Sequence, residues 1–455
     1  MFDDTIAALA TPLGEGGLAV IRISGSRALA VVDRCFIPAG RQAPPLREAT
    51  THTLHYGHVM RDGQRVDEVL VAVLRAPRTF TREDTVEISC HGGMLVARTV
   101  LDTVLAAGAR PAQPGEFTRR AFLNGRLDLA QAEAVAEVIQ ARSELALQAA
   151  NAQLAGHLSR RINQLRDDLM HTLAHVEADL DFPEEDIAPH PRAALLARLE
   201  HSVVFMDELL RTATEGQLLR RGIRAAIVGR PNVGKSSLLN QLLGRDRAIV
   251  SARPGTTRDT IEETANIRGL PVVLVDTAGL REARDEIEQE GIRRSHTAVA
   301  QAELILRVVD LSAPAHPEDL AFLAGGRSGK CVVIGNKADL PRQLEWPASA
   351  LPLTEVSCLD GRGIETLKDR IKEQVWAGEI RADTLEVMIN SRHQDALRRA
   401  REATLRTLDA LRQETPLDLA AVDLRIATRA VGEIVGQTAT EDLLDTIFRE
   451  FCIGK

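Results

Sequence analysis

Apolar and polar residues alternate in two different ways along this chain. Up to residue 120, short apolar runs separated by glycine and polar residues predict a mixed α/β domain. Three of these runs are strand candidates, at 18–23, 68–74 and 85–89. Glycine pairs at 16–17 and 92–93 predict turns.

From Leu127 onward the pattern becomes helical. Apolar residues recur every three or four positions between 154 and 180, which places them in one continuous stripe on a single helix face. The stripe consists of Leu154, Leu158, Ile162, Leu165, Leu169, Leu173, Val176 and Leu180. The segment Asp-Phe-Pro-Glu-Glu-Asp at 181–186 ends it, and a further helix is predicted at 192–219.

Two more helices are predicted within 387–448. Helical segments therefore stand on both sides of the region 220–376, and we expect them to pack into one bundle. The predicted domains are 1–120, a helical domain made of 121–219 and 377–455, and an α/β domain at 220–376 inserted between its two parts.

The sequence Gly-Arg-Pro-Asn-Val-Gly-Lys-Ser at 229–236 matches the phosphate-binding pattern G-x-x-x-x-G-K-[ST]. It follows an apolar run and precedes a leucine-rich segment, as a strand, a turn and a helix N-terminus would. Lys235 would then reach the terminal phosphates, and the Ser236 hydroxyl would ligate Mg²⁺. Nucleotide contacts are predicted for Asn232, Val233, Gly234, Lys235, Ser236 and Ser237.

A second motif follows the strand-like run 271–275 and consists of Asp276, Thr277, Ala278 and Gly279. This position places Asp276 on the magnesium side and the Gly279 N–H near a γ-phosphate. Between the two motifs, Thr257 is the natural second hydroxyl ligand of Mg²⁺.

The third motif, at 336–339, begins with Asn336 and Lys337 and ends with Asp339. The Asp339 carboxylate can accept from guanine N1–H and from the exocyclic amine together, which adenine does not allow, so GTP is favoured over ATP. Ser357 and Cys358 occupy the place of the short base-contacting loop. These signals in this order predict a P-loop GTPase domain.

The residue after the second motif is Leu280, where many small GTPases have a glutamine that orients the attacking water. Leucine cannot hydrogen-bond to water, so another group must position the nucleophile. The pattern alone does not choose among the nearby acids, which are Glu282, Asp285, Glu286, Glu288 and Glu290.

Composition narrows the class of protein. A chain of 455 residues suggests about three domains, and 44% hydrophobic with 26% charged residues is typical of a soluble protein. The formal net charge of −8 argues against indiscriminate binding of polyanions. The five cysteines form no Cys-x-x-Cys pair, which favours a reducing compartment. With no secretory signal and no apolar run near the ~18 residues of a membrane span, we expect a cytoplasmic protein.

Over its whole length the chain resembles the MnmE (TrmE) family of tRNA modification GTPases. The motifs that carry the resemblance are Ala-Thr-Pro at 10–12, Arg-Ile-Ser-Gly at 22–25, Phe-Thr-Arg-Glu-Asp at 80–84, His-Gly-Gly at 91–93, Pro-Gly-Glu-Phe at 114–117, Arg-Ala-Phe-Leu-Asn at 120–124, Leu-Asp-Leu-Ala-Gln-Ala-Glu at 127–133, Asp-Phe-Pro at 181–183 and Phe-Cys-Ile-Gly-Lys at 451–455. The resemblance implies that residues 1–120 form a folate-binding and dimerisation domain, so the protein would be a homodimer.

The folate implied is 5-formyltetrahydrofolate or a related reduced folate, and the matching residues are Arg22, Glu87, Arg126 and the C-terminal Lys455. Arg126 stands where some relatives have lysine, which keeps the charge but changes its geometry.

For the missing glutamine, the resemblance implies Glu288 as the residue that orients the water, with Glu282 as the alternative. It also implies K⁺ in place of an arginine finger, where the cation would offset charge that develops on the phosphates. The matching K⁺ ligands are Asn232, Ser251, the backbone carbonyl of Arg253, and Thr256, and the GTP contacts would include Ser251, Thr256 and Thr257.

The function implied is modification of carbon 5 of the wobble uridine in certain tRNAs, of the carboxymethylaminomethyl type. The partner would be the FAD-dependent protein MnmG (GidA), and folate would deliver a one-carbon unit. Cys452 is either a nucleophile in this chemistry or an inert residue near the chain end.

Two other classes of GTPase share part of this pattern. An Era-type ribosome-assembly GTPase would need an RNA-binding domain, and no basic G-x-x-G segment flanks the GTPase motifs. A dynamin-like mechanical GTPase would not need the folate-type motifs. A measurement of reduced-folate binding would distinguish such a protein from a member of the MnmE family.

Overall fold

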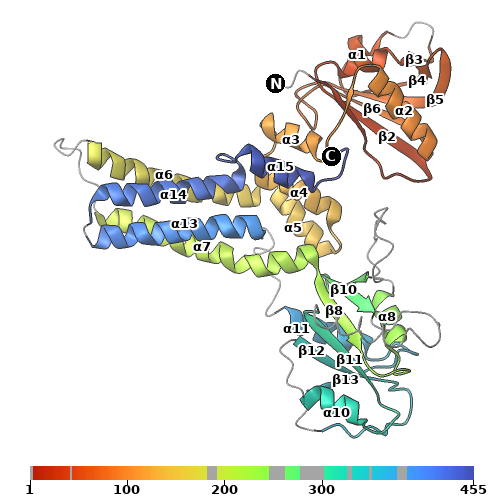
Figure 1. Cartoon of the computed structure of the whole chain (residues 1–455), viewed down its shortest axis with the longest axis vertical. Helices are drawn as coiled ribbons and strands as arrows, with labels where there is room; N and C mark the ends of the chain where they lie inside the picture. The colour runs from red at the N-terminus through yellow and green to blue at the C-terminus, as the bar shows by residue number, and fades with distance from the viewer. Residues whose placement is uncertain are drawn as a thin grey trace. The chain divides into compact units, whose positions relative to one another are not determined.

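The computed structural model describes residues 4–40, 44–181, 192–244, 262–276, 302–324, 330–347, 351–376, 387–413 and 415–455. The chain divides into two compact units (Figure 1). The first contains Met1–Ala136, Leu154–Glu200 and Arg399–Lys455, and the second contains Glu137–Gln153 and His201–Arg398.

The first unit contains a seven-stranded sheet with the order β3-β4-β5-β6-β2-β1-β7. Its strands are β1 (Ile6–Leu9), β2 (Gly16–Ser24), β3 (Phe36–Pro38), β4 (Thr53–Arg61), β5 (Gln64–Leu74), β6 (Thr85–Gly92) and β7 (Arg110–Pro111). Alternate residues of these strands, mostly valine, isoleucine and alanine, form a core with α1 (Ala28–Asp33) and α2 (Met94–Ala106). The three predicted strands are confirmed within β2, β5 and β6.

The prediction of turns at the two glycine pairs is wrong, because Gly16 and Gly92 pair with each other across β2 and β6. A Cβ on Gly92 would lie 2.4 Å from the Gly16 carbonyl oxygen. These glycines therefore allow two backbones to approach closely within the sheet.

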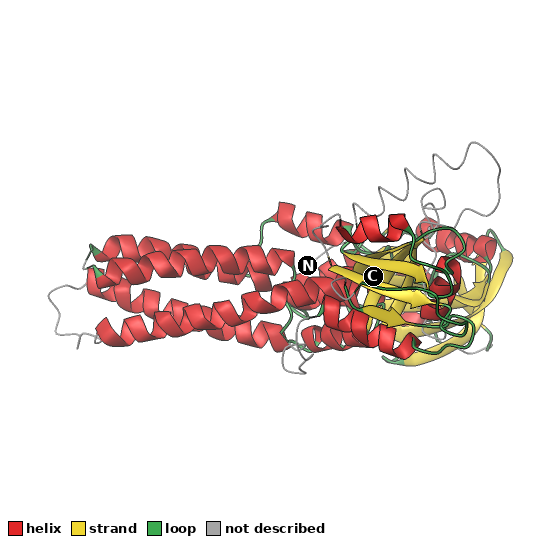
Figure 2. Ribbon diagram, turned by 90° about the horizontal axis from the view of Figure 1, so that it is seen from below, coloured by secondary structure: helices red, strands yellow, loops and turns green. Residues whose placement is uncertain are grey.

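The helical part of the first unit contains α3 (Glu116–Leu123), the start of α4 (Leu129–Gln140), α6 (His157–Asp181), α14 (Leu417–Val435) and α15 (Glu441–Arg449). Helices from before and after the predicted insertion pack together, as Figure 1 shows for α6 and α14. Arg425 on α14 forms an ion pair of 2.8 Å with Glu177 on α6. Figure 2, which colours helices and strands separately, shows that this packing involves helices only.

Two details of the helical prediction are wrong. The apolar stripe is not one helix, because α5 (Glu144–Leu154) ends at Leu154 and α6 begins at His157. Gly156 between them has φ +81°, a left-handed conformation that ends a helix. The region 387–448 contains three helices among the described residues instead of two, namely α13 (Ser391–Arg412), α14 and α15. The helix α14 ends at Val435, before Gly436, which has φ +84°.

The second unit contains a six-stranded sheet with the order β13-β12-β11-β8-β10-β9. Its strands are β8 (Ile223–Val228), β9 (Glu262–Ile267), β10 (Leu270–Asp276), β11 (Leu304–Asp310), β12 (Lys330–Asn336) and β13 (Leu353–Glu355). All neighbours are parallel except β9 and β10. The central strands are apolar runs buried on both faces, as parallel sheets require.

The described helices that begin or end in this unit are α4, α5, α7 (Arg192–Arg221), α8 (Lys235–Leu243), α10 (Pro317–Ala324), α11 (Ile364–Val375) and α13. The helix predicted at 192–219 is confirmed by α7. None of the helices in the described part of the chain is both long and apolar enough to cross a membrane. The domain bounds at 120, 219 and 376 stay predictions.

Candidate functional site

The phosphate-binding motif lies between β8 and α8, at the carboxyl end of a central strand. Lys235 is the first residue of α8, and Gly234 before it has φ +97°. The Lys235 ammonium donates to the carbonyl oxygens of Gly229 at 3.0 Å and Arg230 at 2.9 Å. The loop therefore curls around a cation next to a helix N-terminus, which together favour an anion such as a phosphate.

Asn336, at the end of β12, joins the phosphate loop to the loop that contains Ser357 and Cys358, which is called the base loop below. Its side chain is almost fully buried, at 3% exposed. Its Nδ2 donates to the Val233 carbonyl oxygen at 2.9 Å, and its Oδ1 accepts from the Cys358 N–H at 3.2 Å. A Cβ on Gly234 would lie 2.1 Å from Asn336 Nδ2, so only glycine fits there.

The residues predicted to contact guanine are brought together beside this amide. Ser357 Oγ donates to Asp339 Oδ1 at 2.7 Å, which orients the carboxylate. Lys337, with φ +67°, pairs with Asp310 Oδ2 at 2.5 Å. Burial, and secondarily Asp339, raises the pKa of Cys358 to about 11, so this thiol is neutral at physiological pH.

Two residues that contact the guanine motif and the base loop were not predicted from the sequence. Asp310 ends the apolar strand β11 at the edge of the sheet where ligands bind, a signal that was available. Gln241 on α8 donates to the Cys358 carbonyl oxygen at 2.8 Å, and no sequence pattern identifies it.

Of the residues predicted to lie near Mg²⁺, Ser236 and Asp276 are among the described residues, and both are of types that ligate this ion. The Ser236 hydroxyl is exposed in the first turn of α8. β10 ends at Asp276, which pairs in register with Ile227 of β8, so both strands end at the same edge. Hydroxyl and carboxylate oxygens are ligands that Mg²⁺ prefers. Asn232, with φ +63°, is exposed in the loop, where its amide oxygen suits K⁺.

Several predicted residues lie outside the described residues. They are Ser251, Arg253, Thr256, Thr257, Thr277, Ala278, Gly279, Leu280, Glu282 and Glu288.

A second group of predicted residues meets in the first unit, where the C-terminal tail reaches the sheet. Arg22 Nε donates to Glu87 Oε1 at 2.8 Å, and Arg22 Nη1 donates to the Gly454 carbonyl oxygen at 3.0 Å. Burial and the neighbouring Arg22 lower the pKa of Lys455. Gly454 has φ +93°, and a Cβ there would lie 2.5 Å from the Leu9 carbonyl oxygen. The tail thus depends on its glycine to dock.

Arg126 lies apart from this pair but against the same apolar cluster. It donates to the Thr79 carbonyl oxygen at 2.9 Å and lies over the Phe80 ring at 5.0 Å. Phe80 packs with Phe117, and Arg22 lies 5.8 Å from the Phe117 ring centroid.

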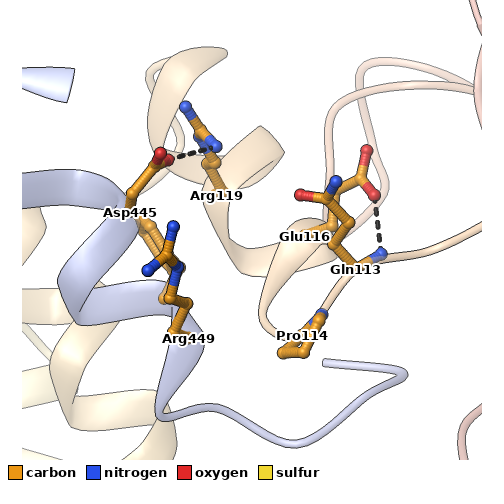
Figure 3. Close-up of a pocket in the computed structure, with 7 residues that line it drawn as sticks. Gln113, Pro114, Glu116, Arg119, Asp445 and Arg449 are labelled. Atoms are coloured by element: carbon orange, nitrogen blue, oxygen red, sulfur yellow. Dashed lines mark hydrogen bonds and ion pairs between the residues drawn. The ribbon is translucent and has the colours of Figure 1, made fainter. Parts of the chain in front are cut away.

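Cys452 is exposed in the tail, and its carbonyl oxygen accepts from the Gly115 N–H at 3.4 Å. Close to this contact, a cavity of about 350 Å³ lies between α3 and α15 (Figure 3). Its lining residues are Gln113, Pro114, Glu116, Arg119, Asp445, Phe448 and Arg449. Arg119 on α3 forms an ion pair of 2.8 Å with Asp445 on α15. No sequence pattern predicted this cavity.

Two family models match the chain. Residues 129–452 match the MnmE helical domain, and residues 5–126 match the N-terminus of the GTP-binding protein TrmE. The chain belongs to the MnmE family. The resemblance stated from the sequence is therefore confirmed, and with it the prediction of a GTPase enzyme.

Full-length relatives agree with this assignment. The tRNA modification GTPase MnmE of Moorella thermoacetica is 51% identical over 466 residues, covering 100% of both chains. That of Geobacillus thermodenitrificans is 46% identical over 461 residues, covering 99% of each. Among solved structures, Era of Aquifex aeolicus bound to GDP and AlF₄⁻ is 26% identical, covering 40% of this chain and 66% of that one. The TM-score of this match is 0.27.

Proposed function

We propose that this MnmE-family chain is a potassium-stimulated GTPase that acts in the cytoplasm on tRNA. Together with an FAD-dependent partner of the MnmG (GidA) type, it would modify carbon 5 of the wobble uridine in certain tRNAs, using a folate one-carbon unit. The observation that carries the proposal is that one chain holds both a phosphate and guanine site and an Arg22–Glu87 pair closed by the C-terminal tail.

The nucleotide site supports GTP hydrolysis through its own residues. The Lys235 ammonium is held by two carbonyl oxygens of the phosphate loop, a place from which it would donate to phosphate oxygens of GTP. Asn336 bonds to Val233 in the phosphate loop and to Cys358 beside the Ser357–Asp339 pair, so the phosphate and guanine ends of GTP would be held at a fixed separation. Bound Mg²⁺ and K⁺ would supply positive charge at the phosphates. Ser236 and Thr257 are the proposed Mg²⁺ ligands, and Asn232, Ser251, Arg253 and Thr256 those for K⁺.

Glu288 is proposed to orient the attacking water, with Glu282 as the alternative. A carboxylate supplies the hydrogen-bond acceptor that Leu280 lacks. The remaining proposed contacts to GTP are Thr277, Ala278 and Gly279 from the second motif.

The folate proposal is supported by the chemistry around Arg22. Glu87 offers a carboxylate, which suits the hydrogen-bond donors of a pterin edge, and Arg22 and Lys455 offer positive charge for a glutamyl tail. Burial, and secondarily the neighbouring Arg22, lowers the pKa of Lys455, and an anionic ligand bound there would favour its charged form.

A homodimer is supported by the face of the first sheet opposite α1 and α2. Arg22 and Glu87 lie on this face, in register with Ala72 of β5 and Leu54 of β4. The neighbouring row includes Tyr56 and Leu70. These apolar side chains are exposed, Leu54 by 72%, and a contiguous apolar face beside a polar site is typical of an interface. The proposed second copy would cover this face.

Titration with 5-formyltetrahydrofolate tests the folate proposal. We expect the intact chain to bind, and both Arg22→Ala and a truncation lacking 452–455 to bind at least about tenfold more weakly, because each removes a contact that closes the site. Arg34→Ala removes an exposed arginine that donates to the Ala107 carbonyl oxygen at 2.8 Å and serves as the control. Equal binding by all four proteins, or none by the intact chain, would contradict the proposal.

A further inference from the structure

The side chain of one basic residue in the phosphate loop takes part in a cluster of ion pairs. Arg230 follows the first glycine of the motif, and its Nε donates to Asp319 Oδ2 at 3.0 Å. The other oxygen of the same carboxylate accepts from Arg307 Nη2 at 2.6 Å. One acidic group on α10 therefore holds two arginines, one from the loop and one from β11.

The Asp319 side chain is buried, with 3% exposed, and both arginines are largely covered. A buried carboxylate is tolerated only when cations and hydrogen bonds compensate its charge, and removing one partner leaves the others uncompensated. Asp319 also stands in the first turn of α10, where the helix dipole favours an anion. Its position is thus fixed by several independent interactions.

These contacts hold the phosphate loop through both the backbone and the side chain of Arg230. Its carbonyl oxygen receives the Lys235 ammonium, while its side chain is bound to Asp319. Arg307 pairs in register with Val228, the residue before the loop begins. Asp319 therefore ties the first turn of the loop to the strand beside it.

We propose that Asp319 is a positioning residue of the nucleotide site, which acts through Arg230 on the carbonyl groups that receive Lys235. Because Arg230 is engaged in this way, its guanidinium is not available as an arginine finger to the nucleotide of its own chain. The account rests on the nucleotide site of the proposed function and assigns that site a residue 89 positions away in the sequence.

The two arginines provide a matched test, since each pairs with the same carboxylate but only Arg230 belongs to the loop. Affinity for a fluorescent GDP analogue would be measured with Mg²⁺ for Asp319→Asn, Arg230→Gln and Arg307→Gln, alongside thermal unfolding. We expect the first two to raise Kd about tenfold, equivalent to about 1.4 kcal/mol. Arg307→Gln should lower stability comparably but change Kd less than about threefold. Arg230→Lys, which keeps a cation, should recover most of the affinity.

Unchanged GDP affinity in folded Arg230→Gln would overturn the proposal, as would an equal loss of affinity in Arg307→Gln. If Asp319→Asn does not fold, the comparison of Arg230→Gln, Arg230→Lys and Arg307→Gln decides alone. Failure of the unaltered chain to bind GDP would instead contradict the proposed GTPase function.

Discussion

The buried amide of Asn336 provides the sharpest quantitative test of the nucleotide site. Asn336→Ala removes a donor to the Val233 carbonyl and an acceptor for the Cys358 N–H. A hydrogen bond contributes about 0.5–1.5 kcal/mol net, and a buried group left without its partner costs about 1–3 kcal/mol. Two such groups give an expected loss of about 2–6 kcal/mol. Units of roughly 150–250 residues shift by about 2–4 °C per kcal/mol, so Tm should fall by about 4–24 °C.

The assay is calorimetric unfolding of the nucleotide-free chain. Because the chain has two compact units, the relevant transition is the one that added GDP moves to higher temperature. Gln241→Ala is the control, since it removes one partly exposed hydrogen bond to the same loop and should cost at most about 1.5 kcal/mol. If Asn336→Ala shifts this transition no more than Gln241→Ala, Asn336 does not join the two loops energetically.

Asp339→Asn should weaken GTP binding and favour xanthosine triphosphate, because the amide presents a donor where guanine also donates; unchanged GTP affinity would exclude this pocket. GTP turnover should be faster in K⁺ than in Na⁺ at equal ionic strength and should lose that preference in Asn232→Ala; equal rates in the two salts would remove the potassium proposal. Glu288→Ala should lower turnover by about 10²-fold with little change in GTP affinity, and the same profile in Glu282→Ala instead would reassign the role. Iodoacetamide at pH 8, followed by peptide mass analysis, should label exposed Cys452 well before Cys358, whose pKa of about 11 leaves almost no thiolate until the pH rises toward that value; equally rapid labelling at pH 8 would contradict this burial.

The fold was predictable where local pattern and tertiary packing agree. The strands at 18–23, 68–74 and 85–89 are short, mostly apolar runs, and each lies in the first sheet. β4 was missed because His55, Gly57 and His58 interrupt its apolar residues, and its identity comes from pairing with β5. The single stripe across Gly156 failed because periodicity does not report one residue with positive φ.

The sequence predicted the motifs of the nucleotide site but not the side-chain contacts that hold these motifs in place. Each motif follows a strand, so the parallel sheet gathers Lys235, Asn336 and Asp339 at one edge. The residues that hold the motifs in place could not be predicted from the sequence. Asp310, which pairs with Lys337, lies on another strand, and Asp319, which pairs with Arg230, lies on α10. The Arg22 contact with Gly454 spans 432 positions, so only the family resemblance brought those chain ends together.

Reconstitution of tRNA modification tests the central claim most directly. The purified chain would be combined with an FAD-loaded MnmG-type protein, unmodified tRNA, reduced folate, a nitrogen donor, GTP, Mg²⁺ and K⁺, and nucleosides would be analysed by mass spectrometry. The account predicts a carbon-5-modified wobble uridine that disappears when the chain or GTP is omitted, and that is strongly reduced by Asp339→Asn. Equal amounts of product with and without this chain, or no product with both proteins folded and cofactor-loaded, would contradict it.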